Sequence, residues 1–216
     1  MIKGARMKKN LLIAGIFFIS FLLVTLCMKT GCLESFDQVI ASAIDQTRNP
    51  FLDLYYTYIT KLGDADIVII FVCLLSIIFN NKNRKMFLST ILISTGLNIL
   101  CKNLIQRPRP TIHQMISVTG FSYPSGHAMI AIAFFGFLIY WIYKNIHHKS
   151  IKIPLIALFS MIILLIGMSR IYLGVHYASD VLGAILLGLS NIICVTTIVN
   201  HKKWKLPFSE ENLKKF

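Results

Sequence analysis

The residue types best suited to chemistry gather in one short polar stretch, residues 169–180, which lies between two long apolar runs. His176 and Asp180 are four residues apart and share one face if the segment is helical. A carboxylate beside an imidazole fixes the ring's tautomer and makes the other nitrogen a better nucleophile or base. Arg170 lies about 600° around a continuous helix from His176. We therefore expect Gly174 to break the helix and bring both residues to one pocket.

A second polar stretch, residues 102–110, follows another apolar run and is basic. It contains Lys102, Arg107 and Arg109, and its two prolines stiffen the chain. Taken alone, the stretch is explained equally well by basic side chains that extend from a membrane into water. Beside the His176 stretch, the same cations predict an anion site.

A third polar stretch, residues 121–127, comes directly before the fourth apolar run. Ser125 is placed as the N-cap of a helix, whose free N–H groups and positive dipole end favour an anion. Gly126 lets the anion approach the backbone closely, and His127 lies at the same helix start. A capped helix with an interfacial histidine remains the alternative for this stretch alone.

The composition indicates a membrane protein. The chain has 216 residues, of which 56% are hydrophobic and 14% are charged, too apolar for an ordinary soluble domain. Its apolar residues form runs close to the ~20 residues that cross a bilayer, although the second run is short. We expect an all-α integral membrane protein with six transmembrane helices in a single domain, residues 1–216. The predicted spans are about 10–28, 62–80, 86–105, 126–143, 152–168 and 178–200.

The basic residues predict the orientation. If the N-terminus is inside, 15 of the 22 Lys and Arg residues fall in inside segments, and seven of the nine acidic residues fall outside. The net charge of +13 is therefore mainly a topology signal, and no basic patch interleaved with aromatic residues suggests nucleic acid. We expect a multi-pass protein of the cytoplasmic membrane with both termini in the cytoplasm. All three polar stretches then lie on the extracytoplasmic side.

Between the first two predicted spans, residues 33–62 have apolar side chains at helical spacing. This pattern predicts an interfacial amphipathic helical segment, which serves either as a lid for a lipid or as a simple anchor. The basic tail, residues 202–216, is predicted to lie on the membrane surface. We expect the first run to be a retained helix, and either Met1 or Met7 fits as the start.

The spacings K-x6-R-P, P-S-G-H and S-R-x5-H-x3-D together resemble the three-part signature of the type 2 phosphatidic acid phosphatase (PAP2) superfamily. Each motif alone is weak, but all three occur in order over residues 102–180 and on one predicted side. Residues 60–64 also resemble the Thr-x-Leu-Gly stretch of bacterial members. The resemblance therefore extends over nearly the whole chain.

The resemblance implies a role for each matching residue. His176 would attack phosphorus and form a phosphohistidine, and Asp180 would orient His176. His127 would protonate the leaving oxygen and then activate water. The phosphate oxygens would be held by Lys102, Arg109, Ser125, Gly126 and Arg170. No metal or other cofactor is expected, because the family is metal-independent and no cluster of metal ligands is apparent. Arg107 lies outside the signature, and its role is open.

The function that we expect is that of a lipid phosphatase acting on the phosphomonoester or diphosphate of a lipid in the bilayer. Phosphatidylglycerol phosphate, phosphatidic acid and undecaprenyl pyrophosphate are the expected substrates. A transporter or binding protein for anionic lipids is the alternative, and it would release no phosphate. Haloperoxidase-like chemistry with vanadate is disfavoured by the membrane layout. The sequence does not predict an oligomeric state.

Overall fold

The computed structural model describes residues 2–112 and 114–201, and all regular structure in them is helical, as predicted. The predicted surface-lying tail, residues 202–216, lies outside the described residues. A π-helical segment, η1 (Ile132–Gly136), continues helix α6 (Gly126–Ala131) into helix α7 (Phe137–Asn145) without a break. The elements are α1 (Ile2–Lys29), α2 (Glu34–Asp45), α3 (Pro50–Lys61), α4 (Ala65–Ile78), α5 (Asn81–Ile105), α6 (Gly126–Ala131), η1 (Ile132–Gly136), α7 (Phe137–Asn145), α8 (Lys149–Tyr172) and α9 (Ala178–His201).

Within the described residues, five helices are long and apolar enough to cross a membrane: α1, α5, α6 to α7, α8 and α9. Large apolar side chains such as Leu12, Ile77 and Leu92 are exposed on the helices, as expected for surfaces that face lipid. Helix α4 is apolar but has only 14 residues. It rises about 21 Å, less than the ~30 Å of a hydrocarbon core. Helix length therefore supports five of the six predicted spans, and α4 is too short to count by length.

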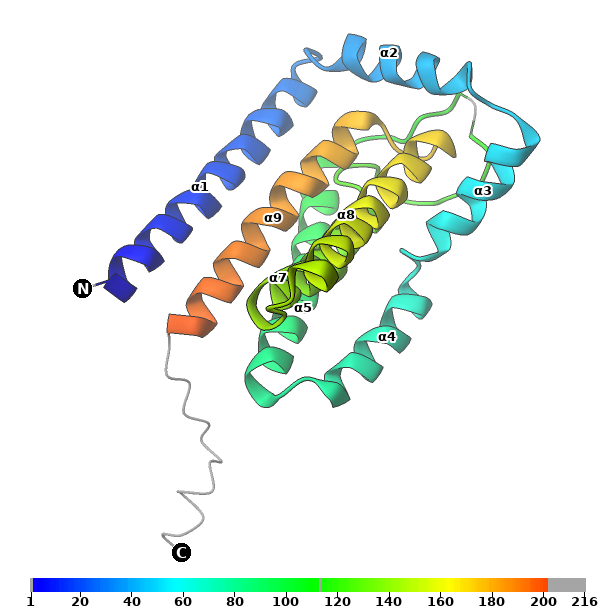
Figure 1. Ribbon diagram of the computed structural model, residues 1–216. Helices are drawn as coiled ribbons and strands as arrows, with labels where there is room; N and C mark the ends of the chain where they lie inside the picture. Colours follow the sequence, from blue (N-terminus) through cyan, green and yellow to red (C-terminus); the bar gives the residue numbers. More distant parts are fainter. Residues whose placement is uncertain (1, 113, 202–216) are drawn as a thin grey trace, which may run out of the picture.

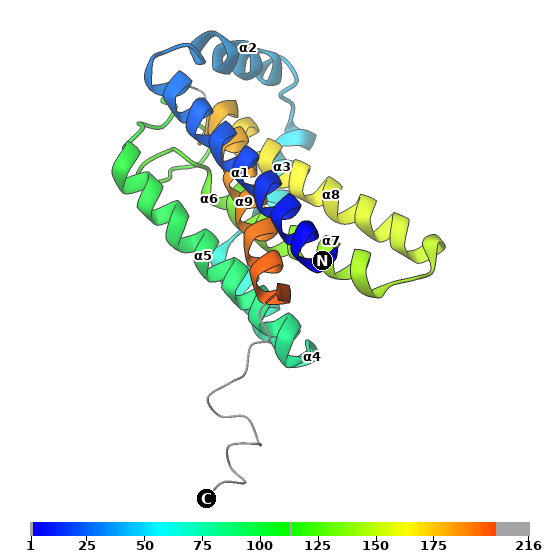
Figure 2. The same cartoon turned by 90° about the vertical axis from the view of Figure 1, so that its left-hand side faces the viewer.

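Helix α9 lies inside the bundle, with α1 alongside it, and α2 crosses one end of the bundle (Figures 1 and 2). Hydrogen bonds join α9 to its neighbours. The hydroxyl of Ser190 donates to the carbonyl of Ala14 on α1 at 2.9 Å. The amide of Asn191 donates to the carbonyl of Thr90 and the hydroxyl of Ser94 on α5 at 3.0 and 2.7 Å. These bonds satisfy polar groups that lipid could not.

The end of the bundle that α2 crosses, called here the α2 end, also carries residues 106–112 and 114–125 and the turn between α8 and α9 (Figure 1). The turn between α4 and α5, the start of α1 and the end of α9 lie toward the opposite end. The three polar stretches singled out in the sequence therefore meet at the α2 end.

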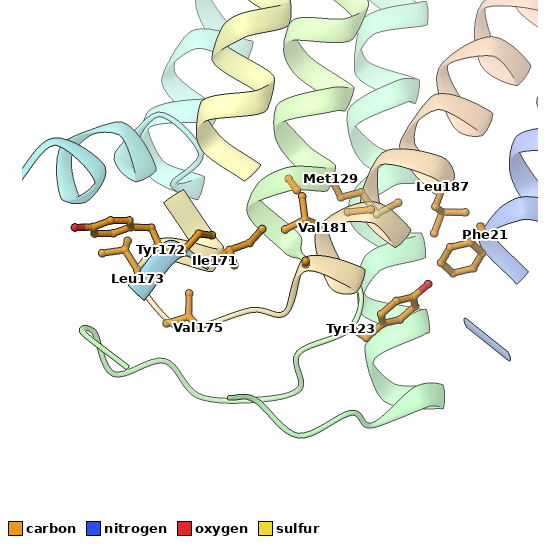
Figure 3. Close-up of a cluster of buried hydrophobic side chains, with 13 residues drawn as sticks. Phe21, Tyr123, Met129, Ile171, Tyr172, Leu173, Val175, Val181 and Leu187 are labelled. Carbon is orange, nitrogen blue, oxygen red and sulfur yellow. The ribbon is translucent and has the colours of Figure 1, made fainter. Parts of the chain in front are cut away.

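A cluster of buried hydrophobic side chains lies beside these loops (Figure 3). Phe21 of α1 stacks on Tyr123 at 5.9 Å between ring centroids, and the Tyr123 hydroxyl bonds to that of Thr25 at 2.9 Å. A Cβ at Gly183 of α9 would overlap the Tyr123 ring. Helix α9 can therefore approach the loop closely only because Gly183 has no side chain.

Candidate active site

Helix ends position the three polar stretches. Helix α8 ends at Tyr172, Gly174 adopts a positive φ of 68°, and α9 begins at Ala178 with Asp180 in its first turn. The predicted break at Gly174 is confirmed, and it folds the chain back so that the N–H of His176 bonds to the carbonyl of Arg170 at 3.2 Å. On α5, the left-handed conformation of Gln106 ends the helix. The chain then turns away from the α5 axis toward the other two stretches.

His176 and Asp180 form a buried pair. Nδ1 of His176 lies 3.3 Å from Oδ2 of Asp180, and the two side chains are 3% and 0% exposed. The same carboxylate oxygen accepts from the hydroxyl of Ser122 and, at 2.8 Å, from the N–H of Tyr177. These donors fix the carboxylate, so Nδ1–H of the imidazole points at it and Nε2 keeps its lone pair.

Arg109 lies on the other side of the imidazole, with a guanidinium nitrogen 3.3 Å from Nε2 of His176. Burial lowers the pKa of His176 to about 4, against the hydrogen bond and charge of Asp180, and Arg109 and Arg170 lower it further. The ring is therefore neutral at pH 7. A neutral imidazole with a free lone pair is the form that acts as a nucleophile.

Three predicted cations surround this pair. Lys102 donates to the carbonyl of Phe121. Arg109 donates to the carbonyls of Gly120 and Val175, and both of these bonds are 2.9 Å long. Arg170 is 3% exposed and donates to the hydroxyl of Thr60 at 2.6 Å.

Arg170 also has a donor without an acceptor. The Nε–H of Arg170 is buried and bonds to no acceptor among the described residues. A buried donor without an acceptor is costly, and an anion bound beside it would satisfy it.

The third stretch contributes a helix start and a second histidine. The hydroxyl of Ser125 caps α6 by accepting from the N–H of Ala128 at 3.5 Å, as the sequence predicted. The N–H of Ser125 donates to the carbonyl of Asp180 at 3.1 Å, which joins the helix start to the His176 pair. Nε2 of His127 lies 2.8 Å from a carboxylate oxygen of Asp64.

The two histidines line different cavities. His176 lies in the wall of a cavity of about 560 Å³ between α2, residues 110–112 and the start of α9, and Lys102, Arg109 and Arg170 do not line this cavity. His127 lies at an apolar groove of about 450 Å³ whose walls come from α4, α5 and the start of the α6 helix. Ala65, Val68, Val72, Leu88, Ile91 and Leu92 line this groove.

The structure adds residues that the sequence did not indicate. Ser122 bonds to Asp180, and Asp64 bonds to His127. Asp37 of α2 accepts from Arg107, which itself bonds to Asp180. Ser122 and Asp64 lie within or beside the motifs, which was the available signal, whereas Asp37 is one of several acidic residues on an amphipathic segment.

A buried, carboxylate-oriented neutral imidazole beside several cations, at one end of an apolar helical bundle, defines a membrane enzyme whose substrate is an anion. Residues 85–204 match the PAP2 superfamily, and the chain belongs to that superfamily of phosphatases. It is therefore a multi-pass membrane phosphatase of the lipid phosphatase family.

Known proteins are similar to this chain in sequence and in fold. The chain is 31% identical over 177 residues to phosphatidylglycerophosphatase B of Bacillus subtilis (strain 168). The match covers 80% of this chain and 87% of the relative. It is 21% identical over 185 residues to lipid phosphate phosphatase delta of Arabidopsis thaliana, covering 80% of this chain and 44% of that protein.

Two crystal structures are similar. The transmembrane PAP2 type phosphatidylglycerolphosphate phosphatase from Bacillus subtilis has a TM-score of 0.80 and 28% identity, covering 89% of this chain and 98% of the other. Aquifex aeolicus LpxE has a TM-score of 0.61 and 27% identity, covering 76% of this chain and 94% of the other.

Proposed function

We propose that the chain is a metal-independent lipid phosphatase that works through a phosphohistidine on His176. The observation that carries this proposal is the neutral His176, held by Asp180 at Nδ1 and facing Arg109 at Nε2. Attack by Nε2 on phosphorus expels the lipid oxygen and leaves a phosphohistidine. Water then attacks the phosphorus, which releases inorganic phosphate and restores the imidazole.

The cations and the helix start would bind the phosphoryl group. Lys102, Arg109 and Arg170 offer charge, and Ser125 and Gly126 present the N–H groups of the α6 start. Charge that develops on the equatorial oxygens is stabilised by donors already in place. Three cations do here what a metal ion does in other phosphatases. Among the described residues, no group of three His, Cys, Asp or Glu is arranged to hold a metal.

His127 fits the general acid. A leaving group departs on the side of phosphorus opposite the nucleophile, and the positive charges of Arg109 and Arg170 act on both His127 and His176, so both histidines adjoin the same cations. The cavity at His127 is the apolar groove, which suits a lipid alcohol as the leaving group. The same histidine then activates the water of the second step, as microscopic reversibility requires.

Phosphatidylglycerol phosphate is the first substrate to test, because the relative at 31% identity is named for it. Phosphatidic acid also releases a lipid alcohol, whereas undecaprenyl pyrophosphate releases undecaprenyl phosphate, which needs less help from an acid to leave. A binding protein or transporter without turnover would not need a neutral imidazole held by a carboxylate. The apolar groove at His127 and the cations beside His176 support a substrate whose tail lies in lipid while its phosphate binds at the helix ends.

The test is phosphate release by the purified protein in detergent with a chelator present. We expect release from at least one of the three lipids, and His176→Ala abolishes it without loss of folding. Release from none of them would overturn the proposal. Activity lost in chelator and restored by a divalent ion would overturn the metal-free mechanism.

For the topology, we propose that residues 1–216 form one membrane domain with six spans, in which α4 is a short sixth span and α2 and α3 lie at the interface. The active site is extracytoplasmic, and both termini are cytoplasmic. The asymmetry of Lys and Arg supports this orientation. A reporter fused after Ser150 should give the cytoplasmic signal and one fused after Thr47 the opposite signal. Exchanged signals would invert the topology.

A further inference from the structure

Arg107, the cation outside the family signature, connects three buried groups. One guanidinium nitrogen donates to Oδ1 of Asp180 at 2.6 Å and to the hydroxyl of Ser179 at 2.7 Å. The other donates to Oδ2 of Asp37 at 2.7 Å. The guanidinium also stacks over the ring of Tyr177 at 4.0 Å from the centroid. Arg107 thus lies between the catalytic carboxylate and α2, and its contacts hold it in one orientation.

The partners of Asp180 divide between its two oxygens. Oδ2 receives the N–H of Tyr177, the hydroxyl of Ser122 and the imidazole of His176. Oδ1 receives Arg107. Because Asp180 is fully buried, water cannot take the place of Arg107 as the partner of Oδ1. The guanidinium therefore sets the rotation of the carboxylate, and with it the direction of the oxygen that holds His176.

Asp37 completes the arrangement from α2. It is 4% exposed and accepts the N–H of Ser179 at 2.8 Å and the hydroxyl of Ser179 at 2.6 Å. Ser179 precedes Asp180 in the first turn of α9. A carboxylate at a helix start satisfies its free N–H groups. Asp37 thus holds both Arg107 and the turn of α9 that carries Asp180.

We propose that Arg107 and Asp37 are positioning residues for the His176–Asp180 pair, through a buried Asp37–Arg107–Asp180 chain that makes α2 part of the active site. This inference rests on the proposed role of His176 as nucleophile. In this arrangement, α2 crosses the end of the bundle and helps to orient His176 through Asp37. Because the bonds of Arg107 go to Asp180, Ser179 and Asp37, both positioning residues should act on the rate of the chemical step more than on substrate binding.

The charges give a second consequence. One guanidinium lies between two buried carboxylates, and its removal leaves Asp180 uncompensated beside His176. The charged groups that face His176 are Asp180, Arg109 and Arg170. An uncompensated Asp180 favours the imidazolium, which cannot attack phosphorus. Loss of Arg107 should therefore move the acid limb of the pH–rate profile to higher pH, an effect that a merely structural residue would not produce.

The experiment compares Arg107→Met, Arg107→Lys and Asp37→Asn with two matched controls on phosphatidylglycerol phosphate in detergent. Arg48→Met removes another arginine that ties the α2 region to the bundle, through Asp45 and the carbonyl of Tyr172. Asp45→Asn neutralises a second acid of α2. The readouts are kcat, KM, the pH–rate profile, inhibition by vanadate, which mimics the transferring phosphoryl group, and thermal unfolding.

For Arg107→Met we expect kcat to fall about 10- to 100-fold, the scale seen for partners that orient a reactive ligand. KM should change less than about threefold, the acid limb should move up, and vanadate should bind about tenfold more weakly. Arg107→Lys should recover part of kcat, because an ammonium has the charge without the fork. Asp37→Asn should lower kcat about three- to tenfold, while both control variants stay near wild type.

Several results would overturn the inference. One is a wild-type kcat and pH profile in both Asp37→Asn and Arg107→Lys. Asp37→Asn keeps the side-chain shape and Arg107→Lys keeps the charge, so both variants remain informative if Arg107→Met does not fold. Another is an equal loss of kcat in Arg48→Met or Asp45→Asn. His176→Ala separates this inference from the proposed function: an inactive His176→Ala with unaffected Arg107 variants rejects the positioning role alone, and an active His176→Ala rejects both.

Discussion

The imidazole of His176 lies between opposite charges, with Nδ1 at 3.3 Å from the carboxylate of Asp180 and Nε2 at 3.3 Å from the guanidinium of Arg109. The carboxylate fixes the proton on Nδ1, and the cation faces the lone pair on Nε2. In the proposed mechanism, a phosphoryl group that binds Arg109 is therefore brought to the nitrogen that attacks it. The two contacts define both the tautomer and the direction of attack.

Replacing either member of the pair should remove most of the activity. We expect His176→Ala to lower kcat at least 10³-fold, because residues of a catalytic unit fail together. Asp180→Asn should lower kcat by a similar factor, since an amide can present its NH₂ to Nδ1 and select the wrong tautomer. Phosphate release and thermal unfolding check both variants. A double variant no worse than either single one would show the shared unit, and additive losses would contradict it.

The lowered pKa of His176 predicts an unusual titration. A histidine with an ordinary pKa of about 6.5 is half protonated at that pH. His176 should instead stay neutral down to about pH 4. Between these values the unfolded chain binds a proton that the folded chain does not. The free energy of unfolding should therefore decrease as pH falls from about 6.5 to about 4, by up to about 3 kcal/mol from this group. NMR of ¹⁵N-histidine protein, assigned with His176→Ala, measures the pKa, and a value near 6.5 would contradict the burial argument.

The role of His127 can be separated from folding by changing the leaving group. A lipid alcohol needs a proton when it leaves, whereas p-nitrophenolate is stable without one. We expect His127→Ala to lower kcat/KM, which reports the step in which the leaving group departs, about 10²- to 10⁴-fold on the lipid phosphate and much less on p-nitrophenyl phosphate. Asp64→Asn should show the same selectivity in weaker form, because Asp64 holds the imidazole. An equal loss on both substrates would assign His127 to another step.

Gly183→Ala tests the packing beside the site. A Cβ there would overlap the Tyr123 ring, which is fully buried and tied to Thr25. We expect a loss of about 1–3 kcal/mol in stability, the usual cost of overpacking a dense core. Gly15→Ala on α1 is the matched control, since nothing lies within 4 Å of its added Cβ. Thermal unfolding in detergent measures both, and equal midpoints would mean that the ring moves freely.

Motif spacing predicted much of the site. It anticipated that His176 would pair with Asp180, that Gly174 would break the helix, and that Ser125 would cap the next one. These features depend on residues close in sequence, or on a helix start, and local patterns record them.

The partners from distant segments could not be predicted in the same way. Asp37 is 70 positions from Arg107, and Asp64 is 63 positions from His127. Neither pair leaves a periodic trace in the sequence, because each forms only when separate helices pack. The second predicted span, residues 62–80, is also shorter as a helix. Gly63 packs tightly against His127 and Ile166, and Asp64 has an extended backbone conformation, so helix α4 begins only at Ala65.

The shortness of α4 has a consequence for the bilayer. A span of 14 residues leaves a hydrophobic mismatch of roughly 9 Å against an average hydrocarbon core, which the lipids relieve by thinning locally. Helix α4 is one wall of the groove that ends at His127. If α4 crosses the membrane as proposed, the membrane is thinnest where the substrate lipid enters. Its headgroup then sits closer to the membrane midplane than the headgroups of the surrounding lipids.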